Sequence, residues 1–154
     1  MNIYYLDSSA ALKRYMDEIG SAWLRAIVDS ATSPVLFVSR LISVEITSAL
    51  NRRLREGTLT PADYTLTQNA FRGDCLSQYK LIPPTEAILE TACDLLERQP
   101  LRAYDAVHLA SALAAQQFLR EQNYFPLTFL CADDRLNAAA SAEGLQVDNP
   151  NHHP

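Results

Sequence analysis

Short apolar segments alternate with helix-length segments along the whole chain, and this alternation limits the possible fold more than any other feature. The apolar segments are rich in aromatic or branched residues, which is typical of buried strands. Strands that are separated by helices pair in parallel through right-handed crossovers. The sequence therefore predicts an α/β fold, a three-layer sandwich in which helices flank a short, mostly parallel sheet. The predicted strands are 3–6, 35–39, 80–84, 127–131 and 145–147.

Helix boundaries are marked by residues that begin and end helices. Thr60, Pro61 and Asp63 form a capping signal with proline at the first helical position. Gly57 stands just past the end of the preceding helix, where glycine terminates helices. These signals and the apolar spacing predict helices at 8–17, 21–31, 41–55, 61–79, 85–99, 104–122 and 134–143.

The length of 154 residues is that of a single domain. We expect one domain over 1–154, with about 150–154 as a flexible tail. The longest apolar run, 106–115, is much shorter than the roughly 20 residues of a membrane span, and no secretion signal is evident. Cys75, Cys93 and Cys131 are widely spaced, so we expect three buried thiols in a cytoplasmic protein rather than disulfides or a zinc site.

The net charge of −5, from 13 basic and 18 acidic residues, is unfavourable for binding nucleic acid through its phosphates. A binding groove needs only a local excess of Lys and Arg, however. An acidic pocket that holds a cation would also account for several of the negative charges.

Four acids occupy positions where a carboxylate is unusual. Asp7 and Asp133 directly follow predicted strands, Asp105 begins an almost wholly apolar helix, and Glu45 lies among apolar neighbours inside another. Each has an ordinary explanation: a helix cap, a partner for a helix dipole, or an acid at the edge of an apolar face. Ligands of parallel α/β folds, however, bind at the carboxyl ends of the strands, where two of these acids lie.

If the four carboxylates converge, each pair about 4 Å apart repels by roughly 4 kcal/mol at an effective dielectric constant near 20. Such a cluster must take up protons or a cation, and carboxylate oxygens select hard ions such as Mg²⁺ or Mn²⁺. A carboxylate-bound Mg²⁺ with open water positions suits phosphoryl chemistry. The acids therefore predict a metal-dependent phosphodiesterase.

Four stretches of the sequence resemble, in order and spacing, the four acidic motifs of the PIN-domain family. They are most similar to the small, stand-alone VapC-type ribonuclease toxins of type II toxin–antitoxin pairs. The resemblance implies a PIN fold, an Mg²⁺- or Mn²⁺-dependent endoribonuclease that leaves a 5′-phosphate, a VapB-like antitoxin partner and a homodimer. The stretches are LDSSAALKRY, SVEITSALNRRL, AYDAVHLASAL and LCADDRLNAAASAEGL.

The resemblance assigns Asp7, Glu45, Asp105 and Asp133 as the catalytic, metal-binding acids. Ser9 matches a small hydroxyl residue of the first motif. Asp134 could share or take the role of Asp133, although the motif fits Asp133 better. Cys131 stands where the family often has Ser or Thr.

Other polar residues near the motifs have two explanations each. His108 follows Asp105 by three residues, and we expect a buried histidine that supports the site rather than a metal ligand. Arg52 belongs to an arginine cluster that either complements a helix dipole or contacts RNA phosphates. The candidates for RNA binding are Lys13, Arg14, Arg40, Arg52 and Arg102.

Other α/β proteins with acidic or phosphate sites fit less well. A haloacid-dehalogenase-like phosphatase needs a second Asp where Ser9 stands, and nucleotide-binding folds need clustered glycines. A phosphoacceptor receiver domain needs an Asp where Ser39 ends the strand 35–39. The alternative that stays open is a catalytically silent PIN-like module that binds RNA or protein.

Overall fold

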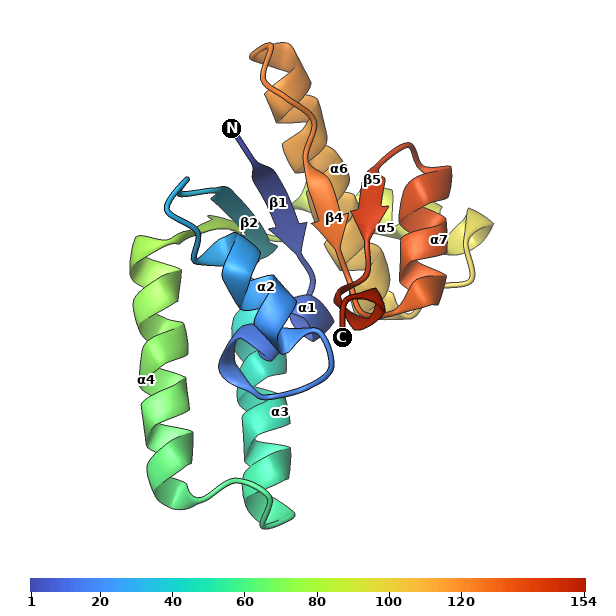
Figure 1. Cartoon of the computed structure of the whole chain (residues 1–154). Coiled ribbons are helices and arrows are strands. Elements are labelled where there is room, and N and C mark those ends of the chain that lie inside the picture. The colour runs from blue at the N-terminus through green and yellow to red at the C-terminus, as the bar shows by residue number, and fades with distance from the viewer.

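A computed structural model describes residues 1–154 as a five-stranded parallel sheet between two layers of helices (Figure 1). The strand order is β3-β2-β1-β4-β5, and every neighbouring pair is parallel. The predicted α/β sandwich is therefore confirmed. The strands are β1 (Ile3–Leu6), β2 (Val35–Ser39), β3 (Tyr79–Ile82), β4 (Thr128–Leu130) and β5 (Gln146–Asp148).

The helices lie where the capping signals and apolar spacing predict them. Thr60 accepts a hydrogen bond from the Asp63 N–H at 3.1 Å, which is the predicted N-cap of α4. None of the helices is both long and apolar enough to cross a membrane. They are α1 (Ser8–Tyr15), α2 (Ser21–Val28), α3 (Ile42–Arg55), α4 (Pro61–Ser77), α5 (Glu86–Arg98), α6 (Ala103–Glu121) and α7 (Asp134–Ala142).

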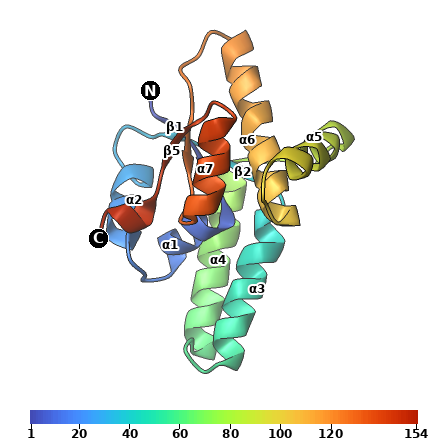
Figure 2. The same ribbon diagram turned by 90° about the vertical axis from the view of Figure 1, so that its right-hand side faces the viewer.

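Alternating side chains of the strands build two cores, one on each face of the sheet. Tyr5 and Phe129 pack in the core that α5, α6 and α7 cover. Leu6 and Val38 point to the opposite core, which α1 to α4 cover. Because α6 contributes ten buried residues, including His108, it lies deepest in its layer. Figure 2 shows α3 and α4 side by side as a hairpin that projects beyond the carboxyl ends of the strands.

Two details differ from expectation. Only Cys131 is buried, whereas Cys75 is half-buried and Cys93 is exposed. The last residues are not a detached tail, because Pro150–His152 forms a short 3₁₀ helix with Pro150 buried. His153 continues this contact by stacking on Trp23 with ring centroids 4.0 Å apart.

The C-terminal segment packs directly on the backbone of Gly20. Gly20 has φ of +80°, and a Cβ atom at this position would lie 2.0 Å from the carbonyl oxygen of Pro150. Only glycine therefore allows this close approach.

We predict that Gly20→Ala destabilises the fold more than Gly57→Ala. Gly57 also has a positive φ, of +75°, but a Cβ there would meet no atom within 4 Å. Gly57→Ala should thus cost only the conformational strain, about 1 kcal/mol, and Gly20→Ala roughly 1–3 kcal/mol more from the clash. Urea denaturation measures both, and equal losses of unfolding free energy would contradict the packing of the C-terminal segment.

Candidate active site

The parallel arrangement of β1 and β4 brings two of the predicted acids to one edge of the sheet. Leu6 and Leu130 are paired in register, and Asp7 follows β1 while Asp133 follows β4 by three residues. The N–H of Asp7 donates to the carbonyl of Leu130 at 3.1 Å, which ties the two strand ends together. Asp105 comes to the same edge in the first turn of α6.

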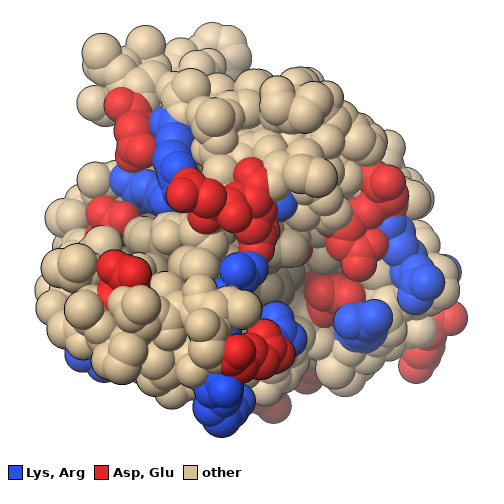
Figure 3. All heavy atoms as spheres, turned by 60° about the horizontal axis from the view of Figure 1, so that its bottom comes forward, with Lys and Arg blue, Asp and Glu red and all other residues tan.

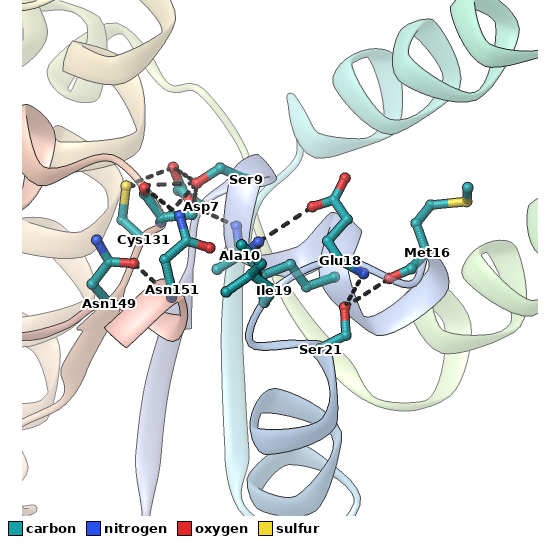
Figure 4. A network of polar contacts seen from close by, with 12 residues as sticks. Asp7, Ser9, Ala10, Met16, Glu18, Ile19, Ser21, Cys131, Asn149 and Asn151 are labelled. Carbon is teal, nitrogen blue, oxygen red and sulfur yellow. Dashed lines mark hydrogen bonds and ion pairs between the residues drawn. The ribbon is translucent and has the colours of Figure 1, made fainter. Parts of the chain in front are cut away.

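Asp7 is 3% exposed, and protein groups surround its carboxylate (Figure 4). Its Oδ1 accepts from the Ala10 N–H at 2.9 Å and from the Ser9 hydroxyl at 2.7 Å. The Cys131 thiol donates to Oδ2 at 3.0 Å. Burial raises the pKa of Asp7, and the charge of His108 and these donors offset only part of the increase. Asp7 is therefore both a helix cap and a buried acid.

The pKa of Asp105 depends on the charges of Asp7 and Asp133. Burial raises its pKa, and the charges of Asp7 and Asp133 raise it further, while His108 and Arg102 lower it. No Lys or Arg forms an ion pair with Asp7, Asp105 or Asp133. The three carboxylates therefore have no direct ion-pair partner among the Lys and Arg side chains.

Asp133 and the adjacent Asp134 face different partners. Asp133 caps α7, with its Oδ1 accepting from the Arg135 N–H at 2.8 Å. The Asp134 side chain is 75% exposed and accepts from Asn149 Nδ2 at 2.6 Å, so the C-terminal segment holds it. Of the two acids, Asp133 is the one whose charge reaches Asp105. This placement favours Asp133 for the role that the fourth motif predicts.

Glu45 lies on α3 and is held through both of its carboxylate oxygens. Oε1 is 2.5 Å from His108 Nε2, and Oε2 accepts from the Ser8 hydroxyl at 2.7 Å. His108 is 1% exposed, and its Nδ1 is 2.9 Å from the Tyr5 hydroxyl. Burial alone lowers the pKa of His108, but the hydrogen bond and charge of Glu45, with Asp7 and Asp105, raise it above the ordinary value. A continuous polar chain therefore runs from the core to Glu45, and any role of His108 in a reaction stays a prediction.

The side chains do not form a ready-made metal site in this structure. No group of three or more His, Cys, Asp or Glu side chains is arranged so that it could hold one ion. Glu45 is paired with His108, and an oxygen of Asp133 caps α7. The donor set nevertheless fits a hard dication, because Asp7, Asp105 and Asp133 offer carboxylate oxygens and form no ion pair with a Lys or Arg side chain. The metal-ligand assignment stays a prediction.

A groove of about 430 Å³ runs beside these acids, between α3 and the start of α6. Acidic and basic side chains intermix on this side of the molecule in Figure 3, and neither sign dominates. A larger hollow of about 650 Å³ lies near the start of β2 and contains none of the predicted acids. The larger volume of this hollow therefore does not identify it as the functional site. The groove is lined by Ser8, Val44, Glu45, Ser48, Ala49, Arg52 and Tyr104.

Two of the cations predicted to bind RNA are already paired within the protein. Lys13 is 4% exposed and donates to Glu18 and to the carbonyl of Ile19. Arg14 forms ion pairs with Asp29 at 2.6 Å and Asp74 at 3.3 Å, and its side chain is 7% exposed.

The RNA-binding assignment of Lys13 and Arg14 is therefore corrected: both stabilise the fold, because their charges are neutralised by acids and shielded from solvent. Arg40, Arg52 and Arg102 are exposed and form no ion pair, so they remain candidates.

Several residues of the site were not assigned a role from the sequence. Cys131 donates to Asp7 and accepts from the Asp133 N–H at 3.2 Å, so the thiol connects two of the acids. Asn151 donates to the carbonyl of Ala132 at 3.3 Å, beside Asp7 in Figure 4. Cys131 was recognisable only as a replacement for Ser or Thr, and nothing in the sequence indicates that the last residues return to this loop.

Comparisons with known proteins agree with the sequence motifs and the fold. The PIN domain model matches residues 4–119. Ribonuclease VapC45 of Mycobacterium tuberculosis is 30% identical over 148 residues, which cover 96% of this chain and 95% of that protein.

Solved structures show the same fold at lower identity. A toxin-antitoxin complex from Klebsiella pneumoniae contains a chain with a TM-score of 0.61 and 16% identity, covering 96% of this chain and 97% of that one. Mycobacterium tuberculosis VapC20, described as a sarcin-ricin loop cleaving toxin, has a TM-score of 0.62 and 18% identity, covering 90% of this chain and 95% of that one.

We predict that Asp105→Asn stabilises the metal-free protein at neutral pH by roughly 0.5–1 kcal/mol. The pKa of Asp105 is raised in the folded state, so its ionisation opposes folding above that pKa. The gain should shrink as the pH falls through the folded pKa of Asp105, because the wild-type carboxyl is then neutral too. Urea denaturation in EDTA between pH 4 and 8 measures the effect.

The exposed Asp94 of α5 provides the matched control, and Asp94→Asn should change the unfolding free energy by less than about 0.5 kcal/mol. A loss of stability in Asp105→Asn at pH 7 would show that Asp105 is not repelled by its neighbours.

Proposed function

The chain belongs to the PIN-domain family, and on this premise we propose that it is a divalent-metal-dependent endoribonuclease, the toxin of a VapBC-type toxin–antitoxin pair. We propose one nuclease domain over residues 1–154. The observation that supports the proposal is the placement of Asp7, Asp105 and Asp133 at one edge of the sheet, where burial and then the charges of Asp7 and Asp133 raise the pKa of Asp105. The relative named Ribonuclease VapC45 supports the activity.

Asp7, Asp105 and Asp133 would hold Mg²⁺ or Mn²⁺, with Glu45 binding through water or completing a second ion site. The bound cation would supply a polarised water for attack on the scissile phosphate and would offset the charge that grows on the phosphate oxygens. The N-termini of α1 and α6 point partial positive charge at the same region.

The surrounding residues would hold the carboxylates in place before the substrate arrives. Ser9, Cys131 and the Ala10 N–H orient Asp7. His108 and Ser8 fix the two oxygens of Glu45. Such support reduces the reorganisation that a ligand set needs when it binds an ion or a phosphate.

RNA would contact the exposed cations along this edge. Arg40, Arg52 and Arg102 are free of ion pairs and lie on or beside the elements that carry the acids. Their guanidinium groups match phosphate geometry.

An antitoxin would act as the protein partner of this domain. The structural neighbour from Klebsiella pneumoniae is described as a toxin-antitoxin complex, which supports a VapB-like partner here. We also propose a homodimer. Apolar side chains on the outer surfaces of α5 and α6, such as Leu89 and Phe118, are available for such contacts.

The alternative is a catalytically silent PIN-like module that binds RNA or protein. The absence of a ready-made ligand cluster in the side-chain positions favours this alternative. A metal titration distinguishes the two, because an enzyme cleaves RNA whereas a binding module only changes its mobility.

We predict that Asp7→Asn lowers cleavage of a structureless RNA by about 1,000-fold or more, because a lost metal ligand removes several kcal/mol of transition-state stabilisation. Cleavage is followed by gel electrophoresis with Mg²⁺ or Mn²⁺, and EDTA should abolish it in the wild type. Circular dichroism checks that the variant is folded. Unchanged cleavage by folded Asp7→Asn would contradict the proposed mechanism.

We also predict that the chain arrests growth when it is expressed alone in a bacterial host, and that coexpression of its proposed VapB-like antitoxin restores growth. Asp7→Asn should not arrest growth, which separates ribonuclease toxicity from the general burden of expression. Equal arrest by the wild type and Asp7→Asn would exclude RNA cleavage as the cause.

A further inference from the structure

The groove between α3 and α6 continues directly from the acidic edge. Ser8 follows Asp7 in the chain, and Tyr104 precedes Asp105, so two residues that line the groove adjoin predicted metal ligands. The Ser8 hydroxyl donates to Glu45, which also lines the groove, at 2.7 Å. A strand of RNA whose phosphate reaches the acids would place a flanking nucleotide here.

One wall of the groove is a stripe of α3 that ends in an unpaired cation. Glu45, Ser48 and Arg52 are spaced at i, i+3 and i+7, which puts them on the same side of a helix. Arg52 lies two turns, about 11 Å, beyond Glu45 along the helix. It is exposed and forms no ion pair, whereas the adjacent Arg53 is paired with Glu18. Arg52 is thus available for an anion.

The other wall carries an exposed aromatic ring. Tyr104 is 52% exposed, and its side chain makes no hydrogen bond or aromatic contact within the protein. A half-exposed tyrosine that lines a groove and has no hydrogen-bond partner or aromatic neighbour offers ring surface to a ligand. Bases of single-stranded RNA stack on such faces regardless of their sequence.

We propose that this groove is a nucleotide subsite for single-stranded RNA, in which a base beside the scissile phosphate stacks on Tyr104 and a phosphate binds Arg52. The proposal rests on the proposed ribonuclease function and specifies how its substrate is positioned. It also assigns a role in RNA binding to Tyr104, a residue of the third motif stretch that has no role in the proposed function.

The chemistry of the groove favours a nucleotide over a peptide. Both oxygens of Glu45 are already hydrogen-bonded, to His108 and Ser8, so the α3 wall presents no unpartnered carboxylate to a phosphate. An aromatic face and a free guanidinium within one cavity of about 430 Å³ match the base and phosphate of a nucleotide.

The test measures RNA binding without cleavage. Fluorescence anisotropy of a labelled, structureless RNA is recorded in EDTA, with every variant made in the Asp7→Asn background. Tyr104→Ala should weaken binding about 5- to 150-fold, the effect of losing one stacked base. Tyr104→Phe keeps the ring and should stay within about twofold of its background.

Matched controls come from the far end of α6. Tyr124 has the same exposure as Tyr104, 52%, and Tyr124→Ala should leave RNA affinity unchanged. Arg52→Ala should reduce the slope of log K against log salt by about 0.7, the value for one phosphate contact with a single strand. Arg120→Ala, an exposed arginine near Tyr124, should not change the slope.

The outcomes separate this proposal from the proposed function. Cleavage by the wild type together with unchanged RNA affinity in Tyr104→Ala and Arg52→Ala would overturn the subsite and leave the nuclease intact. Absence of RNA binding by the background variant would overturn the subsite as well. If Tyr104→Ala instead weakens only the binding of a coexpressed antitoxin, the groove is a protein docking site and the subsite is wrong.

Discussion

The electrostatic repulsion among Asp7, Asp105 and Asp133 is the constraint on which the rest of the site depends. Parallel pairing of β1 and β4 and the insertion of α6 into the core place the backbone of all three residues at one edge of the sheet. Hydrogen bonds stabilise the carboxylate of Asp7, and Asp133 caps α7, but neither acid forms an ion pair with a Lys or Arg side chain. In the proposed function, a cation from solution would supply the neutralising charge.

A second polar unit joins the core to the groove. Tyr5, His108, Glu45 and Ser8 form a chain that begins inside one hydrophobic core and ends at the groove wall. A buried polar chain is favourable only when its members are satisfied, and here each link has a partner. Glu45 therefore belongs to the rigid part of the site, in contrast to the exposed Tyr104 and Arg52, which are free to adjust to a substrate.

Much of the fold and part of the site could be predicted from the sequence because the signals are local. Strand-ending acids, the Thr60 cap and apolar spacing each involve neighbouring residues, and the structure has the five strands and seven helices expected. The ion pairs that Lys13 and Arg14 form within the protein could not be predicted in this way. Arg14, for example, pairs with Asp74, which is distant in the sequence. The stacking of His153 on Trp23 is likewise a contact between opposite ends of the chain, and it replaced an expected flexible tail.

The central claim is that Asp7, Asp105 and Asp133 are gathered so that together they take up a hard dication. A crystal of the protein soaked in Mn²⁺ tests this directly, because anomalous scattering locates the ion independently of any activity. We expect a peak bound by these three carboxylates, and no such peak in a matched crystal of Asp7→Asn. Ordered carboxylates without a peak, or a peak at another place on the molecule, would contradict the account.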